Sequence, residues 1–313
     1  MVRVADVEYV VFGHTDLARM SYFLTDFGMK TVSSAQGELL MRGAGEQPYV
    51  YVAQQAETSG IRAIGMRVNS MDDLKAAAEF PESSPVEPIA RAGGGHRVRL
   101  TSPDGIPFEL TYGIARAAPL PMRDPLRINH AREKRRNGAW QRPQLEPAQV
   151  LRLGHVALTT AAYKANAHWL ETRLGMKASD ILFDGTHDNA LGGFFHCRGG
   201  GDWVDHHTIA LFPSARPKVH HCSFEVQDLD AQFLGNKYML ARKWRPLWGV
   251  GRHILGSQIF DYWFDPDGNV VEHFTDGDLV APEKEAEFHQ ISDDSLAQWG
   301  PPIAVQDFVD YKA

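Results

Sequence analysis

The chain repeats itself, and this internal duplication restricts its fold more than any other feature of the sequence. Three segments of the second half match segments of the first half in the same order: 151–159 matches 5–13, 218–226 matches 60–68, and 265–268 matches 102–105. The last match is a tight turn, in which Pro266 presets φ and Gly268 tolerates a positive φ. Two copies of one pattern predict two domains of similar architecture.

Each half contains two units in which a strand is followed by a helix and then by further strands. The first unit is expected to have a strand at 6–12, a helix at 16–27 capped by Thr15, and strands at 30–34, 38–42 and 49–53. The second unit is expected to have a strand at 62–68, a helix near 71–80, and strands at 96–100 and 107–112. We therefore predict an α+β fold of four βαβββ modules, paired into two barrel-like domains.

This organisation divides the chain into four segments. They are a first domain at 1–113, a linker at 114–150, a second domain at 151–278 and a C-terminal tail at 279–313. The linker is rich in proline and arginine, and we expect it to wrap over the domain surfaces; a nucleic-acid-binding arm is the weaker alternative. The tail either folds back over the barrel mouth or joins a subunit contact, and its sequence does not decide between the two.

The composition argues against several classes of protein. The net charge of −7, from 32 basic and 39 acidic residues, argues against a general nucleic-acid binder. The sequence has neither the long apolar stretch of a membrane span nor the features of a signal peptide at its N-terminus. Two cysteines are too few for a disulfide scaffold, so the reducing cytoplasm is the expected compartment.

The two halves differ at positions that should share one cavity. Three pairs of matched positions carry the comparison: Tyr9 with His155, Ala63 with His221, and Glu109 with Glu272. A structural requirement would be expected in both copies, yet the histidines appear in the second copy alone. This asymmetry indicates a function for the second half.

His155, His221 and Glu272 lie in three different predicted strands of the second half. Glu272 belongs to the strand at 269–274, whose other residues are mostly apolar, and a carboxylate is costly to bury there without a positive partner. Two imidazoles and a carboxylate can hold one face of an octahedral divalent metal and leave the opposite positions open. Because side chains alternate along a strand, His220 is expected to point away from this site. The alternative is a purely structural role, with two histidines in the core and a glutamate at a strand end. It would be favoured for any one of these residues alone, but not for the three together.

These segments resemble the type I extradiol ring-cleavage dioxygenases of the vicinal-oxygen-chelate superfamily, which share their fold with glyoxalases and bleomycin-resistance proteins. The resemblance rests on GHVAL at 154–158, on HHCSF at 220–224 and on the run from Gly251 to Glu272. It covers nearly the whole chain and is dense in the second half. In the histidine pair, the family pattern places the metal ligand second and therefore selects His221. The resemblance implies that residues 151–278 are the catalytic domain and that 1–113 lacks a metal site.

The resemblance also implies roles for three further residues. His207 opens the segment HTIA and matches the acid–base histidine of the family, although His206 directly precedes it. Tyr262 matches a tyrosine that hydrogen-bonds a substrate oxygen, and His253 matches a histidine on the substrate side. The alternatives are that Tyr262 packs its ring in a strand and that His253 stabilises a loop.

The function that the resemblance implies is extradiol cleavage of a catechol-type ring in the degradation of aromatic compounds. Fe(II), or Mn(II) with the same ligands, would be the metal, O2 the co-substrate, and a homo-oligomer the expected assembly. Bicyclic or alkylated catechols and trihydroxylated toluenes remain open as substrates. Candidates for an aromatic lining are Phe195, Trp203, Trp248, Ile254 and Phe260, each with a core or rim position as its alternative.

Two other functions compete with this one. A glyoxalase-like isomerase would complete one metal site with ligands from both halves, and Tyr9 and Ala63 cannot supply them. A non-catalytic small-molecule-binding member of the superfamily would have no need for His155, His207 and His221 together.

Overall fold

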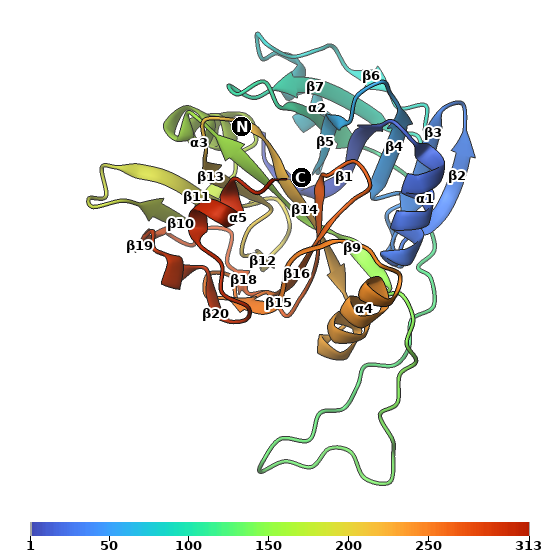
Figure 1. The fold of residues 1–313 in the computed structure, drawn as a ribbon. Coiled ribbons are helices and arrows are strands. Elements are labelled where there is room, and N and C mark those ends of the chain that lie inside the picture. The colour runs from blue at the N-terminus through green and yellow to red at the C-terminus, as the bar shows by residue number, and fades with distance from the viewer. Residues whose placement is uncertain (1, 313) are drawn as a thin grey trace.

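The computed structural model describes residues 2–312 and contains four βαβββ modules (Figure 1). The first is β1 (Val4–His14), α1 (Leu17–Asp26), β2 (Lys30–Ala35), β3 (Glu38–Arg42) and β4 (Tyr51–Gln55). The second is β5 (Gly60–Val68), α2 (Met71–Ala78), β6 (Glu87–Pro88), β7 (His96–Thr101) and β8 (Pro107–Tyr112). Together they form one sheet in the order β2-β3-β4-β1-β5-β8-β7-β6.

The second half repeats this arrangement. Its third module is β9 (Val150–Thr160), α3 (Tyr163–Arg173), β10 (Lys177–Phe183), β11 (Ala190–His196) and β13 (Ile209–Pro213), with the short β12 (Val204–Asp205) inserted. The fourth is β14 (Lys218–Val226), α4 (Leu229–Ala241), β15 (Pro246–His253), β16 (Ile259–Phe264) and β17 (Val270–Thr275). The predicted α+β fold of paired βαβββ modules is confirmed.

Strand register confirms the duplication residue by residue. Gly65 lies between Tyr9 and Glu109 in the first sheet, and Ser223 lies between His155 and Glu272 in the second. Because register decides which side chains face each other across a sheet, the matched positions meet in the same way in both halves. The comparison between the two copies is therefore a comparison of equivalent sites.

Two local predictions were wrong. The side chain that caps α1 belongs to Asp16 rather than Thr15, since the carboxylate of Asp16 accepts the backbone N–H of Arg19 at 2.9 Å. The linker packs on the domains through its ends, where the N–H of Leu120 donates to the carbonyl of Ala44, but its middle extends away from both sheets as a long loop (Figure 1).

The C-terminal tail folds back onto the second half. It contains β18 (Leu279–Val280), β19 (Glu287–Gln290), the short 3-10 helix Asp293–Ser295, β20 (Ala297–Trp299) and α5 (Val305–Val309). Strand β19 adds to β10 and strand β20 adds to β15, so the tail extends the second sheet at both edges. Of the two positions that the sequence left open, the tail takes the one over its own domain.

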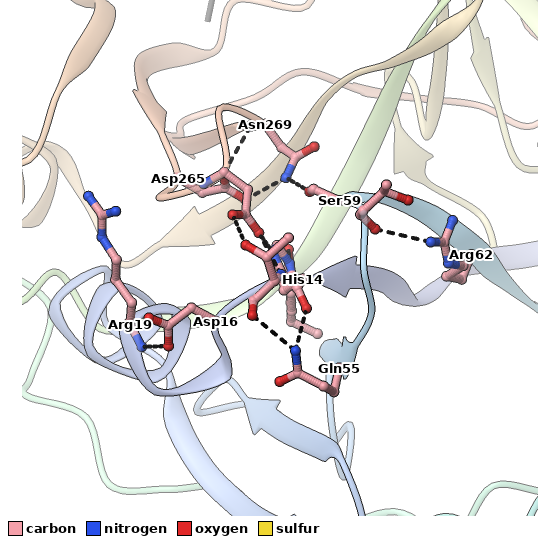
Figure 2. A network of polar contacts seen from close by, with 12 residues as sticks. His14, Asp16, Arg19, Gln55, Ser59, Arg62, Asp265 and Asn269 are labelled. Carbon is pink, nitrogen blue, oxygen red and sulfur yellow. Dashed lines mark hydrogen bonds and ion pairs between the residues drawn. The ribbon is translucent and has the colours of Figure 1, made fainter.

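The turns of each half contact the other half. Figure 2 shows the contact around His14, at the end of β1. The imidazole of His14 lies 2.7 Å from the Asp267 carboxylate, and the hydroxyl of Thr15 donates to that carboxylate at 2.9 Å. The matched turn of the first half also contacts the other half, because the amide of Asn166 in α3 donates to Asp104 at 2.8 Å. Residues of both halves also share one buried apolar core, and no helix within residues 2–312 is long and apolar enough to cross a membrane.

Asp261 of β16 is expected to make the stability of the protein fall as pH rises. Its fully buried carboxyl accepts hydrogen bonds from Trp263 and Asn236, and burial raises its pKa from 3.8 to about 7. Because the folded state favours the protonated form, this contribution to stability is present below pH 3.8 and is lost as pH rises through about 7. Relative to Asp261→Asn, the parent should lose on the order of 4 kcal/mol of unfolding free energy across this range.

Urea unfolding of the metal-free protein at several pH values between about 4 and 8 measures this difference. Asp267→Asn serves as a control: burial opposes ionisation of Asp267, but hydrogen bonds from His14 and Thr15 outweigh it and lower its pKa. Its contribution is lost only as pH falls below the usual aspartate range, so the Asp267→Asn difference should stay flat between about pH 5 and 8. A flat Asp261→Asn difference would contradict the prediction.

Candidate metal centre

His155, His221 and Glu272 meet in the second half, as the sequence predicts. They come from the neighbouring strands β9, β14 and β17, and their potential ligand atoms all lie within 4.8 Å of one another. The carboxylate Oε2 of Glu272 lies 3.2 Å from Nε2 of His155 and 3.4 Å from Nε2 of His221. All three side chains are buried.

The carboxylate of Glu272 lacks a hydrogen-bond donor within residues 2–312. Neither oxygen is hydrogen-bonded to any residue between 2 and 312, although the side chain is fully buried. In the first half, the equivalent Glu109 accepts the hydroxyl of Tyr9 at 2.5 Å and the guanidinium of Arg97 at 2.9 Å. A buried carboxylate without partners is costly. The protein satisfies this group in one copy and leaves it free, beside two imidazoles, in the other.

His220 orients the imidazole of His221. Nε2 of His220 donates to the backbone carbonyl of Phe308 at 2.8 Å, which leaves its Nδ1 to accept a hydrogen bond from the Nδ1–H of His221 at 2.7 Å. The bare Nε2 of His221 then faces Glu272, as a metal ligand requires. Alternation predicts that His220 points away, but a bulge in β14 brings its ring against that of His221.

His207 lies beside the three residues and is coupled to His206. Its ring centre is 4.3 Å from that of His155, and its Nδ1 lies 3.1 Å from Nδ1 of His206. Burial lowers the pKa of His207 well below its usual range, with neighbouring His155 adding to the effect. Burial also holds the pKa of His221 low, so both imidazoles are neutral near pH 7.

Tyr262 and His253 form a hydrogen-bonded pair beside His221. Nδ1 of His253 donates to the carbonyl of Leu296 at 2.8 Å, so its Nε2 accepts the hydroxyl of Tyr262 at 2.8 Å. The ring of Tyr262 lies 5.0 Å from that of His221. Burial, with the nearby charge of Glu272, raises the pKa of Tyr262 well above its usual value and keeps it a phenol.

Five of the six predicted site residues border one cavity. His155, His207, His221, His253 and Tyr262 all line it. Its other walls are largely apolar, and the tail supplies one of them through Ile291, Ser295, Leu296, Val305, Phe308 and Val309. A mostly apolar cavity with a few polar groups that converge on it is typical of a small-molecule site.

The aromatic lining differs from the prediction. Phe194, Phe212 and Phe308 form it, and none of the five predicted residues lines the cavity. Phe195 follows Phe194 on β11 and therefore faces the opposite side, in the core. Trp203 and Ile254 are exposed, whereas Trp248 and Phe260 pack behind the site, where the ring of Trp248 stacks parallel to that of Tyr262.

Several residues of the site were not predicted, among them His206 and the tail residue Phe308. The doubled histidines at 206–207 and 220–221 were visible in the sequence, but what the first member of each pair contacts was not. Their partners lie far away along the chain: Asp180 is 2.8 Å from Nε2 of His206, and Phe308 is the acceptor for His220.

Comparison with known proteins places the second half in a described family. Residues 152–273 match the model of the Glyoxalase/Bleomycin resistance protein/Dioxygenase superfamily. Metapyrocatechase 2 of Cupriavidus necator is 31% identical over 214 residues, which cover 68% of this chain and 63% of that protein. The chain thus spans less than two thirds of this relative's length.

Two further similarities extend over more of the chain. Manganese-dependent 2,3-dihydroxybiphenyl 1,2-dioxygenase of Geobacillus genomosp. 3 is 23% identical over 300 residues, which cover 87% of each chain. The crystal structure of the Mn(II)-bound glyoxalase from Novosphingobium aromaticivorans superposes with a TM-score of 0.81 at 22% identity, covering 100% of this chain and 96% of that one. The latter similarity establishes a shared fold.

Proposed function

We propose that this chain, which belongs to the Glyoxalase/Bleomycin resistance protein/Dioxygenase superfamily, is an extradiol dioxygenase that opens a catechol-type ring beside its diol. One observation carries the proposal: the buried carboxylate of Glu272 has no hydrogen-bond donor within residues 2–312 and faces Nε2 of His155 and of His221. The two curated relatives, a metapyrocatechase and a dihydroxybiphenyl dioxygenase, support the reaction class.

His155, His221 and Glu272 fit a divalent metal, because two imidazoles and a carboxylate without a hydrogen-bond donor among residues 2–312 are suitable ligands for Fe(II) or Mn(II). When bound, such an ion would supply Lewis-acid and one-electron chemistry toward the diol and O2. The hydrogen bond from His221 to His220 keeps the ligand nitrogen bare. The glutamate would neutralise part of the ion's charge inside an apolar wall.

The remaining residues would bind the diol and move its protons. Nε2 of His207 is suited to accept a hydroxyl proton and to return it later, since burial keeps this imidazole neutral. Tyr262 remains a phenol whose hydroxyl donates a hydrogen bond to His253, so its oxygen can accept a hydrogen bond from a diol hydroxyl. The aromatic rings of Phe194, Phe212 and Phe308 would hold the substrate ring and exclude water.

The lining also indicates the class of substrate. Beyond the histidines, the cavity wall within residues 2–312 is formed by apolar side chains, Tyr262, Gln258 and Ser295, with no lysine or arginine. A carboxylate on the substrate would therefore lose its hydration without gaining a cationic partner. We infer that the diol carries an apolar substituent, as in alkylated or bicyclic catechols.

Oxygen uptake with a panel of catechols tests the proposed function. The protein is reconstituted anaerobically with Fe(II) or Mn(II), mixed with each catechol in air, and followed by oxygen electrode and by the yellow ring-opened product. For catechols with alkyl or phenyl substituents, kcat/KM should be about tenfold or more higher than for catechols with a carboxymethyl group. A buried substrate carboxylate without a hydrogen-bond donor costs about 1.4 kcal/mol or more, which corresponds to about a tenfold difference. No uptake with any catechol would refute the dioxygenase assignment.

The glyoxalase-like alternative finds less support. A site shared between the halves would need metal ligands from the first half, where Glu109 is already bound by Tyr9 and Arg97.

On sequence grounds, we also propose that the protein is a cytoplasmic homo-oligomer. Light scattering at several protein concentrations measures the assembly state.

A further inference from the structure

A chain of hydrogen bonds runs from His207 to the protein surface. Nδ1 of His207 lies 3.1 Å from Nδ1 of His206, and Nε2 of His206 lies 2.8 Å from Oδ2 of Asp180. The other oxygen of Asp180 is 2.9 Å from Nε2 of His289. His206 and Asp180 are buried, whereas the side chain of His289 is 31% exposed. These hydrogen bonds therefore connect the cavity with solvent through the buried side chains of His206 and Asp180.

Asp180 is the anionic member of this chain. Burial opposes its ionisation, but hydrogen bonds from His206 and His289 outweigh that effect and lower its pKa. As a carboxylate it can only accept, so Nε2 of His206 must carry a proton and donate a hydrogen bond to Asp180. The tail supplies His289, because β19 pairs with β10 and places His289 beside Leu182, two residues beyond Asp180.

His206, which donates to Asp180, determines the tautomer of His207. A neutral His206 with its proton on Nε2 has a bare Nδ1, which can only accept. Nδ1 of His207 must then carry the proton that it donates across the 3.1 Å contact. Nε2 of His207 is left bare and has no hydrogen-bond partner within the described chain, on a residue that lines the cavity.

The second histidine pair of the site is arranged in the same way. His220 donates from Nε2 to the carbonyl of Phe308 and accepts at Nδ1 from His221, whose bare Nε2 faces the metal centre. In each pair, an anchored first histidine orients the second. The anchors differ, since His220 meets a neutral carbonyl and His206 meets a carboxylate that also binds a surface histidine.

We propose that Asp180 and His206 are positioning residues that hold His207 with its proton on Nδ1 and its bare Nε2 toward the cavity. This inference rests on the proposed function, in which Nε2 of His207 accepts a proton from the diol. A base must present a lone pair to the hydroxyl that it deprotonates. The hydrogen bond at the far nitrogen decides which nitrogen has that lone pair.

The cluster of Asp180, His289 and Glu287 has no separate role as a metal site in this proposal. Glu287 is exposed, and its carboxylate accepts a hydrogen bond from Lys284 at 2.9 Å. It does not hydrogen-bond Asp180 or His289, so it offers a matched control. Glu287→Gln changes a neighbouring carboxylate and leaves the hydrogen bonds that lead from Asp180 to His207 intact.

Imidazole nitrogen NMR tests the tautomer without any metal or catalysis. The metal-free protein is labelled with 15N-histidine, and His207 is assigned by the signals that disappear in His207→Asn. The proposal expects a protonated Nδ1 and a bare Nε2 in the parent and in Glu287→Gln. In His206→Leu, which removes the acceptor, the proton should move to Nε2 in a substantial fraction of molecules. A parent protein with its proton on Nε2, or an unchanged tautomer in His206→Leu, overturns the proposal.

Kinetics of the Fe(II)-loaded protein provide the second test. Asp180→Asn should lower kcat by about 10- to 100-fold with little change in KM for the diol or in bound iron, because a supporting partner is altered and the ligands are not. In a His207→Asn background, the same substitution should have no further effect. A KM effect alone, or fully additive losses, would indicate a merely structural role. If the parent cleaves no catechol, the proposed function fails, and the NMR result still decides the tautomer.

Discussion

Replacing Glu272 with glutamine is expected to remove the stabilisation that a divalent metal gives to this protein. In the parent, both carboxylate oxygens are buried without a donor among residues 2–312, so an ion at His155 and His221 would supply the missing charge. At a metal concentration about 100 times the dissociation constant, binding should stabilise the folded state by about 2.7 kcal/mol. Thermal unfolding with and without Mn(II), which resists oxidation in air, measures this difference.

Glu109→Gln is the matched control, because the same residue type stands at the equivalent position of the first half. Glu109 is already satisfied by Tyr9 and Arg97. Its replacement should lower the stability of the metal-free and metal-loaded proteins alike, by about 1–3 kcal/mol, and leave the metal-dependent difference intact. A metal-dependent shift that survives in Glu272→Gln would show that the ion binds elsewhere. Its loss in Glu109→Gln would show that the two halves are not independent.

The metal centre could be predicted because two regularities of the sequence determine it. The duplication identifies equivalent positions, and the alternation of strand residues decides which of them share a face. His155 and Glu272 both flank Ser223 in the observed register, as Tyr9 and Glu109 flank Gly65. A difference between equivalent positions then indicates a functional residue without any other sequence for comparison.

What could not be predicted depends on irregular backbone or on contacts between distant segments. The bulge in β14 that brings His220 against His221 breaks the alternation on which the prediction relied. The aromatic lining was displaced by one residue on β11, where Phe194 faces the cavity and Phe195 faces the core. A single-residue error in phase is enough to exchange the two faces of a strand.

The tail shows the same limit over a longer range. It has no counterpart in the first half, so the duplication carried no information about its position. Nevertheless it covers the cavity with Phe308, anchors His220 through its backbone and brings His289 to Asp180. These contacts join residues about 90 to 110 positions apart, and no local pattern predicts which distant strand edge a short segment will join.

Replacing His207 with asparagine is expected to lower kcat by about 10²- to 10⁴-fold, the usual contribution of a positioned acid–base group. Asparagine preserves polarity and can still hydrogen-bond His206, but it cannot take up a proton near pH 7. His155, His221 and Glu272 are unchanged, so metal content should remain close to that of the parent. KM for the diol should change little, because the apolar wall of Phe194, Phe212 and Phe308 is intact.

The separation of kcat from KM is the decisive measurement, made on protein whose iron content has been determined. His207→Phe provides the comparison, since it fills the space and removes every polar atom of the side chain; it should lose at least as much kcat as His207→Asn. If His207 only shaped the cavity, the larger aromatic ring would raise KM and asparagine would be tolerated. An asparagine variant with parental kcat would assign the acid–base role to another group, and Tyr262, which also lines the cavity, would be the next residue to replace.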